Sequence, residues 1–214
     1  MPTAFEDLPY ARFVESFDGE LAIEGEYDCV RVTDRELERA ELRNVRFNES
    51  ALSELSFTGG NLSYSRFTDV WLRQVNMAGT MLSESSWLDG EVIESAWAGV
   101  EAVGTSIRRV TFTGCKFDAV NFRTARLQDV VFRDCTLRDV DFGDAKLTSL
   151  GFPGSRVQGL LVNKTTMKNV DFRGAQMLTV ADGIGSLRGA VVNHGQLMEL
   201  APAFAAAAGL KVED

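Results

Sequence analysis

Carboxylates that recur every twenty residues are the most distinctive candidate chemistry in this sequence. If residues twenty apart lie one above another at the β spacing of about 4.8 Å, each set forms an anionic column along a rod. Such a column could imitate duplex phosphates, which lie about 1.7 Å apart along the axis when both strands are counted. Two sets share a phase: Glu49, Asp69, Asp89 and Asp129, interrupted by Arg109, and Asp34, Glu54, Glu94 and Asp134.

Cations on the same side of the expected rod leave a second interpretation open. Arg46, Arg66, Arg126 and Lys146 share a phase three residues before the first acidic column. If these cations pair with the acids, the surface carries compensated charge ladders instead of an anionic stripe. Both interpretations are compatible with the sequence.

A band of apolar residues at outward phases is the other candidate site. Trp71 and Ile93 are its main members, with Met81, Leu88 and Val103 within two coils of them. An exposed apolar band of this kind can mark a surface for a protein partner. It predicts a structural scaffold or interaction module as the alternative to a phosphate mimic.

Residues suited to catalysis are sparse. His194 is the single histidine, so any Ser–His–Asp or Cys–His site would depend on it alone. Cys115 and Cys135 share an inward phase, which indicates packing. Asp139, Asp141 and Asp144 are close in sequence, but they lie among arginines and lack the glycine of a calcium loop. The sequence therefore predicts no enzyme, no cofactor and no metal site.

The elements that must position the acidic columns follow from a period of five. A bulky apolar residue occupies every fifth position, and a small or β-branched residue precedes it by two. This period fits neither a helix nor a flat strand, so it predicts a unit that turns a corner every five residues. The clearest run of bulky centres is Phe112, Phe117, Phe122, Leu127, Phe132, Leu137, Phe142, Leu147, Phe152, Val157, Val162, Met167 and Phe172.

The five-residue period is nested in one of twenty, because Phe112, Phe132, Phe152 and Phe172 share one phase. Four units of five predict a four-sided coil with these rings stacked inside. The phase runs without insertion through Met177, so we expect about seven to eight coils at the β spacing.

The repeat resembles that of the pentapeptide-repeat family, and VDFGD at 140–144, AKLTS at 145–149 and AELRN at 40–44 carry the resemblance. The family consensus is a small residue, a polar residue, Leu or Phe, then two polar residues. The resemblance implies an all-β fold, a right-handed quadrilateral β-helix, with a short C-terminal α-helical cap. We expect an acidic N-terminal cap at 1–29, the β-helix at 30–181 and a C-terminal helical cap at 182–214.

The last segment shows helical spacing of Leu197, Leu200 and Phe204. Pro202 fits the first turn of a helix better than its interior, so two short helices are expected, at about 194–200 and 202–208. Their apolar face could close the last coil or pair with a second copy as a homodimer. This combination resembles the actinobacterial fluoroquinolone-resistance branch of the family, whose members dimerise through this end.

Composition and charge narrow the class of partner. The net charge is −9, which argues against direct nucleic-acid binding. Three cysteines without metal-type spacing, no leader-like N-terminus and no long apolar run predict a cytoplasmic protein outside the membrane. The family branch implies a protein partner, DNA gyrase or another type II topoisomerase, whose DNA-binding surface a DNA mimic would occupy. Such a role links the chain to resistance to topoisomerase inhibitors.

Overall fold

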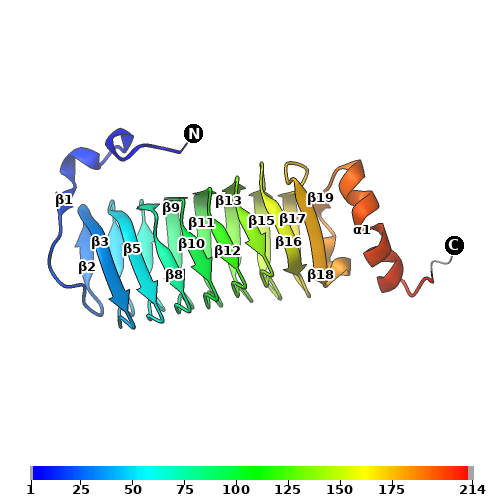
Figure 1. Cartoon of the computed structure of the whole chain (residues 1–214), viewed down its shortest axis with the longest axis horizontal. Coiled ribbons are helices and arrows are strands. Elements are labelled where there is room, and N and C mark those ends of the chain that lie inside the picture. The colour runs from blue at the N-terminus through cyan, green and yellow to red at the C-terminus, as the bar shows by residue number, and fades with distance from the viewer. Residues whose placement is uncertain (1, 212–214) are drawn as a thin grey trace.

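The computed structural model describes residues 2–211 and is a parallel β-solenoid of about eight coils that ends in one helix (Figure 1). Strands of successive coils pair in parallel, and the usual register joins residue i to residue i+20, as in Phe112 with Phe132. The strands are β1 (Glu15–Ser16), β2 (Glu26–Asp28), β3 (Val30–Glu38), β4 (Arg46–Asn48), β5 (Ala51–Thr58), β6 (Arg66–Thr68), β7 (Trp71–Arg73), β8 (Asn76–Ala78), β9 (Ser86–Ile93), β10 (Ala96–Ala98), β11 (Ser106–Thr113), β12 (Lys116–Asp118), β13 (Arg126–Arg133), β14 (Thr136–Arg138), β15 (Lys146–Gly151), β16 (Arg156–Leu161), β17 (Thr166–Asp171), β18 (Met177–Asp182) and β19 (Ala190–Val191).

The chain turns at corners five residues apart, and most corner residues are in the left-handed region of the backbone. Asp69 has φ of 50° and Asp89 has φ of 55°, and Gly59 and Gly79 hold the equivalent place at another corner. Glycine adopts this conformation freely because it has no Cβ, and among the other residues Asn and Asp adopt it most readily. Twelve of the 23 non-glycine residues with positive φ are Asp or Glu, so the corners concentrate the acids of the solenoid.

The interior is filled by the predicted stack of aromatic rings. The ring centroids of Phe112 and Phe132 are 5.1 Å apart, those of Phe132 and Phe152 5.3 Å, and those of Phe152 and Phe172 4.7 Å. The prediction that these four rings form one vertical file is confirmed. Each buried ring contributes about 1.5–3 kcal/mol of apolar burial, and the file fixes the vertical alignment of the corners outside it.

The expected register is wrong in its last step. Leu178 is fully buried where Met177 was expected at the centre, and β16 pairs Val157 with Leu178, a separation of 21 residues. The register between β16 and β18 is irregular, so one extra residue enters the last coil. A phase of five cannot reveal such a bulge when an apolar residue occupies both positions.

The C-terminal cap is one helix, α1 (His194–Ala207), and not the two short helices that were expected. Asn193 and Gln196 form a reciprocal capping box that fixes its start. Pro202 lies inside the helix; it removes one backbone hydrogen bond, but the alanines after it are strong helix formers. A short 3₁₀ helix, η3 (Ile184–Leu187), connects the last coil to α1. No helix within residues 2–211 is both long and apolar enough to cross a bilayer.

The N-terminal segment has two parts. Phe17 packs on Tyr27 at the open end of the solenoid, with centroids 5.1 Å apart, and β1 pairs with β3. Residues 2–13, called the arm here, contain the 3₁₀ helices η1 (Phe5–Asp7) and η2 (Ala11–Phe13). The arm runs back along the outside of the coils (Figure 1), so the expected end cap also covers one long face.

Candidate functional site

The two acidic columns follow neighbouring corners and border one face of the solenoid, called the bracketed face here. All eight carboxylates predicted as site residues have positive φ and therefore sit at corners. Between the corners lie Trp71 and Ile93, the main members of the expected apolar band. The structure thus brings the charged and apolar candidates together on one side of the rod. The eight carboxylates are Asp34, Glu49, Glu54, Asp69, Asp89, Glu94, Asp129 and Asp134.

The expectation that Trp71 and Ile93 are exposed is wrong, because the arm covers them. Their exposed fractions are 5% and 4%, and Phe5 and Leu8 pack against them. The Trp71 indole N–H donates to the Thr3 carbonyl at 3.0 Å, and its ring lies 5.9 Å from that of Phe5. The arm therefore covers the two main members of the expected band, whereas Met81 is 42% exposed.

The first column is continuous over three coils, and we call Glu49, Asp69 and Asp89 the acidic corner. These three are half-buried, whereas Asp129 is exposed. Burial, with Asp89 and Glu49 nearby, raises the pKa of Asp69. Arg109 ends the run by binding Asp89 through two hydrogen bonds, of 2.5 and 2.6 Å, which lower the pKa of Asp89. Within residues 2–211, Glu49 and Asp69 form no ion pair, so unpaired negative charge is concentrated on them.

The second column is not continuous. Gln74 and Gly114 occupy its corner between the acids. Glu94 accepts hydrogen bonds from Arg73 at 3.3 Å and from Gln74 at 3.4 Å. Asp34, Glu54, Glu94 and Asp134 therefore share a corner, but they do not form an anionic stripe.

The cations expected to neutralise the first column do not pair with it. Arg66, Arg126 and Lys146 are exposed and form no ion pair within residues 2–211, and Arg46 pairs with Glu26 of the preceding coil. No acid takes an outward position of this face from Arg46 to Lys168. We call this the basic face, and its cations are Arg46, Arg66, Arg108, Arg126, Lys146 and Lys168.

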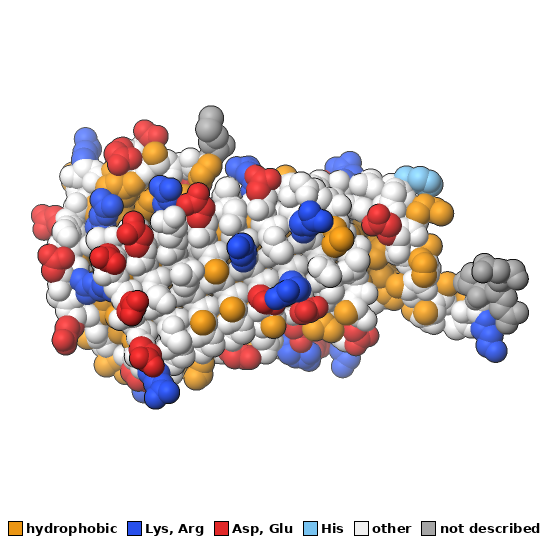
Figure 2. Space-filling model, in the orientation of Figure 1, with side chains coloured by type: hydrophobic (Ala, Val, Ile, Leu, Met, Phe, Trp, Pro, Cys, Tyr) orange, Lys and Arg blue, Asp and Glu red, His pale blue; other side chains and the backbone are white. Residues whose placement is uncertain are grey.

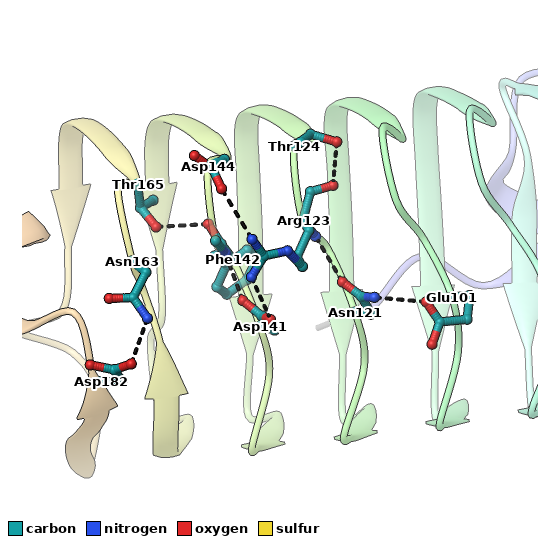
Figure 3. A network of polar contacts seen from close by, with 11 residues as sticks. Glu101, Asn121, Arg123, Thr124, Asp141, Phe142, Asp144, Asn163, Thr165 and Asp182 are labelled. Atoms are coloured by element: carbon teal, nitrogen blue, oxygen red, sulfur yellow. Dashed lines mark hydrogen bonds and ion pairs between the residues drawn. The ribbon is translucent and has the colours of Figure 1, made fainter.

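Compensated ladders do occur, on another side of the solenoid (Figure 3). Arg123 contacts Asp141 at 3.3 Å and Asp144 at 3.1 Å, and Asn121 donates to Glu101 at 2.7 Å. Two members of the Asp139–Asp141–Asp144 cluster are therefore bound by one guanidinium. Within residues 2–211 no group of three or more His, Cys, Asp or Glu residues is placed to hold a metal ion.

Sequence reasoning missed the arm as part of the site. Tyr10 lies against the acidic corner, and Thr3 donates its backbone N–H to the Glu91 carboxylate at 3.0 and 3.2 Å. Contacts across 88 residues leave no local pattern, so the available signals were few. Trp71 and Ile93 at outward phases were one such signal, because large apolar residues there need a cover.

The C-terminal candidates divide between two roles. Leu200 is buried against the last coil, whereas Leu197 and Phe204 are 46% and 38% exposed. The exposed pair lines an apolar hollow with Ala201, Ala205 and Leu210, where Figure 2 shows apolar side chains gathered on α1. His194, at the first turn of α1, is exposed.

Two family models and one solved structure agree with the observed fold. A family model described as a pentapeptide repeat region matches residues 98–162, and one described as pentapeptide repeats matches residues 36–79. A trypsin-treated form of QnrB1, a plasmid-mediated fluoroquinolone resistance protein, is 15% identical with a TM-score of 0.50, over 89% of this chain and 100% of its own. HetL from the cyanobacterium Nostoc, a pentapeptide repeat protein involved in heterocyst differentiation regulation, is 14% identical with a TM-score of 0.39, over 79% and 92%. No curated protein sequence matches significantly.

Proposed function

The chain belongs to the pentapeptide-repeat family, and we propose that it is a non-catalytic binding protein that docks through its acidic corner on the DNA-binding surface of DNA gyrase or another type II topoisomerase. The observation that carries this proposal is the run of Glu49, Asp69 and Asp89, three carboxylates on consecutive coils of a straight rod. A groove that normally holds phosphates is basic, so a rigid row of carboxylates complements it. The likeness of fold to QnrB1, a fluoroquinolone resistance protein, supports the same class of role.

The distribution of charge makes this docking one-sided. Figure 2 shows acidic and basic side chains interspersed over the face in view, and the basic face lies next to the acidic corner. A basic groove would attract the acidic corner and repel the basic face, because juxtaposed like charges are unfavourable. The partner would therefore meet the rod along the early coils, in one rotational orientation.

Supercoiling by purified gyrase, with and without a fluoroquinolone, tests the proposal. We expect the protein to change either the supercoiling rate or the fluoroquinolone sensitivity at micromolar concentration. The double variant Asp69→Asn/Asp89→Asn should reduce that effect. Asp134→Asn/Asp139→Asn is the matched control, because both of its sites are also left-handed corners with carboxylates. Unchanged supercoiling and sensitivity with the wild-type protein would refute the proposal.

We further propose that the exposed face of α1 pairs two copies of the chain. Leu197 and Phe204 present apolar surface away from the solenoid, which supports an isologous contact. Light scattering coupled to size exclusion should give a dimer for wild type and a monomer for Leu197→Glu/Phe204→Glu. Glu199→Gln, on an exposed position of the same helix, is the control and should stay dimeric. A wild-type monomer at high protein concentration would contradict this assignment.

A further inference from the structure

A cavity of about 390 Å³ lies where the arm crosses the acidic corner. We propose that this cavity is a binding site for an organic cation, namely a primary ammonium or guanidinium group carried on a short alkyl chain. The site shares two residues with the proposed docking surface, Asp69 and Asp89, and it opens to solvent. It is lined by both the arm and the coils, and neither part alone would form it.

Gly90 and Val70 line the cavity on the side of the coils. Gly90 takes the small inward position of its coil, where the neighbouring coils carry Val70 and Val110. A Cβ built on Gly90 would lie 3.4 Å from the Val70 side chain and 3.7 Å from that of Val110. Leu8, Pro9 and Thr3 of the arm form the opposite wall. Leu8, Pro9 and Val70 can contact the alkyl part of a ligand.

The charge around the cavity favours a cation. Asp69, Asp89 and Glu91 line it, and Arg133 is the one cation among its lining residues. Arg109 binds Asp89, and Glu91 accepts the Thr3 N–H, so both already have a donor. Asp69 has neither an ion pair nor a side-chain hydrogen bond within residues 2–211, although it is half-buried. A half-buried carboxylate without a donor is unfavourable, and a bound ammonium or guanidinium would supply that donor.

Tyr10 is the second, independent observation. Its side chain lines the cavity and is only 7% exposed, yet its hydroxyl has no hydrogen-bond partner in the described part of the chain. Tyr10 lines the same cavity as Asp69 and Glu91, and burial, together with the carboxylates of Asp69, Glu49 and Glu91, raises the pKa of Tyr10. The hydroxyl oxygen is not sealed off by the protein, so a ligand in the cavity can reach it. A cationic head group between Asp69 and Tyr10 could bind both oxygens.

This chemistry has two sources, a free amine or a lysine or arginine side chain of a partner protein. The geometry of the cavity, and not the identity of any partner, carries the inference. If this chain alters gyrase activity but binds no organic cation, only the cation site is refuted. If it binds the cation but leaves gyrase unaffected, only the proposed function is refuted.

Amide chemical shifts of the ¹⁵N-labelled full chain, titrated with n-butylguanidinium and n-butylammonium chloride, test the site. We expect saturable shifts at Thr3, Gly90 and Glu91 with at least one of the two cations. Sodium chloride at equal ionic strength, and n-pentanol as a neutral analogue, should not produce them. Arginine and lysine blocked at both ends as amides form a second arm. Tighter binding of these points to a protein side chain, and tighter binding of spermidine points to a free amine.

Three variants sharpen the titration. Asp69→Asn should weaken binding about tenfold, as expected for the loss of one charge-assisted hydrogen bond. Tyr10→Phe should weaken it about threefold, the effect of one neutral hydrogen bond. Asp129→Asn, at the same corner outside the cavity and with a matching φ of 54°, should leave binding unchanged. Absence of saturable shifts, equal shifts with n-pentanol, or an Asp69→Asn titration identical to wild type would overturn the proposal.

Discussion

The early and later coils of the solenoid repeat one backbone, but they carry different side chains at the corner of the first acidic column and on the bracketed face beside it. In the early coils, up to β10, the corner carries the half-buried Glu49, Asp69 and Asp89, and the arm covers the bracketed face. In the later coils the corner carries Arg109, Asp129 and Ser149, and the bracketed face there has Thr111 and Val131 in place of Trp71. Side chains alone therefore give one repeated backbone a face that the arm covers in the early coils and a face without that cover in the later ones.

The comparison also shows how far acidity can be used as evidence of function. More than half of the non-glycine corner residues are acidic, and the left-handed backbone itself favours Asp over most residues. An acidic corner is therefore partly a consequence of the fold. What distinguishes the early coils is the burial of their carboxylates beneath the arm and the lack of a donor for Asp69.

The largest difference between the halves should appear on truncating the covered aromatic. Trp71→Ala should lower the free energy of unfolding by about 3–5 kcal/mol, the range for large buried aromatics. Val131→Ala, three coils later at the same place, should cost about 0.5 kcal/mol or less, because Val131 is half-exposed. Urea unfolding followed by circular dichroism measures both. Equal losses would show that the arm adds nothing to the early coils.

A smaller effect is expected when the arm is loosened without changing the solenoid. Phe5→Ala removes a ring that contacts Trp71 and receives the Arg31 guanidinium at 4.9 Å. The docked state of the arm should lose about 1–2 kcal/mol. Tryptophan emission reports this change, because Trp87 and Trp97 stay in the core. We expect a red shift with unchanged circular dichroism, and Phe13→Ala, at an exposed arm residue, is the control that should show none.

The smallest effects should come from the neighbouring corner acids, and their signs should be opposite. The pKa of Asp69 is raised, so its stabilising contribution is present only at low pH and is lost as pH rises; Asp69→Asn should stabilise the fold at pH 7. Arg109 lowers the pKa of Asp89 in the folded state. The Asp89 carboxylate therefore stabilises the fold above its unfolded-state pKa, and this stabilisation is lost as pH falls through the folded-state pKa. Asp89→Asn should cost about 0.5 kcal/mol at pH 7, discounted for solvent screening. Thermal melts between pH 3 and pH 7 should show the two variants converging on wild type at the acid end. Shifts of the same sign for both variants at pH 7 would contradict this assignment of the two pKa values.

Much of the fold could be predicted because each coil repeats a local rule. A bulky residue every fifth position dictated the interior, and the file from Phe112 to Phe172 followed from its phase. The extra residue before Leu178 could not be predicted, since Met177 was an equally apolar centre. The single helix was missed because Pro202 alone predicts a break. The capping box at its start and the alanines around Pro202 stabilise the continuous helix.

The candidate site was only half predictable for a related reason. Corner positions follow from the period, so the eight carboxylates could be placed on the outside of the rod. Their surroundings depend on the arm, whose contacts span as many as 88 residues and have no period. The exposure of Trp71 and Ile93 was therefore wrong, and the cavity beside Gly90 could not be foreseen.

Binding to purified gyrase tests the central claim most directly, when measured for two triple variants of opposite charge. Glu49→Gln/Asp69→Asn/Asp89→Asn removes the acidic corner, and Arg66→Gln/Arg126→Gln/Lys146→Gln removes the centre of the basic face. We predict that the first variant binds at least about tenfold more weakly, a difference of about 1.4 kcal/mol, and that the second binds as tightly as wild type or more tightly. Equal affinities for all three proteins, or a greater loss in the basic-face variant, would contradict docking through the acidic corner.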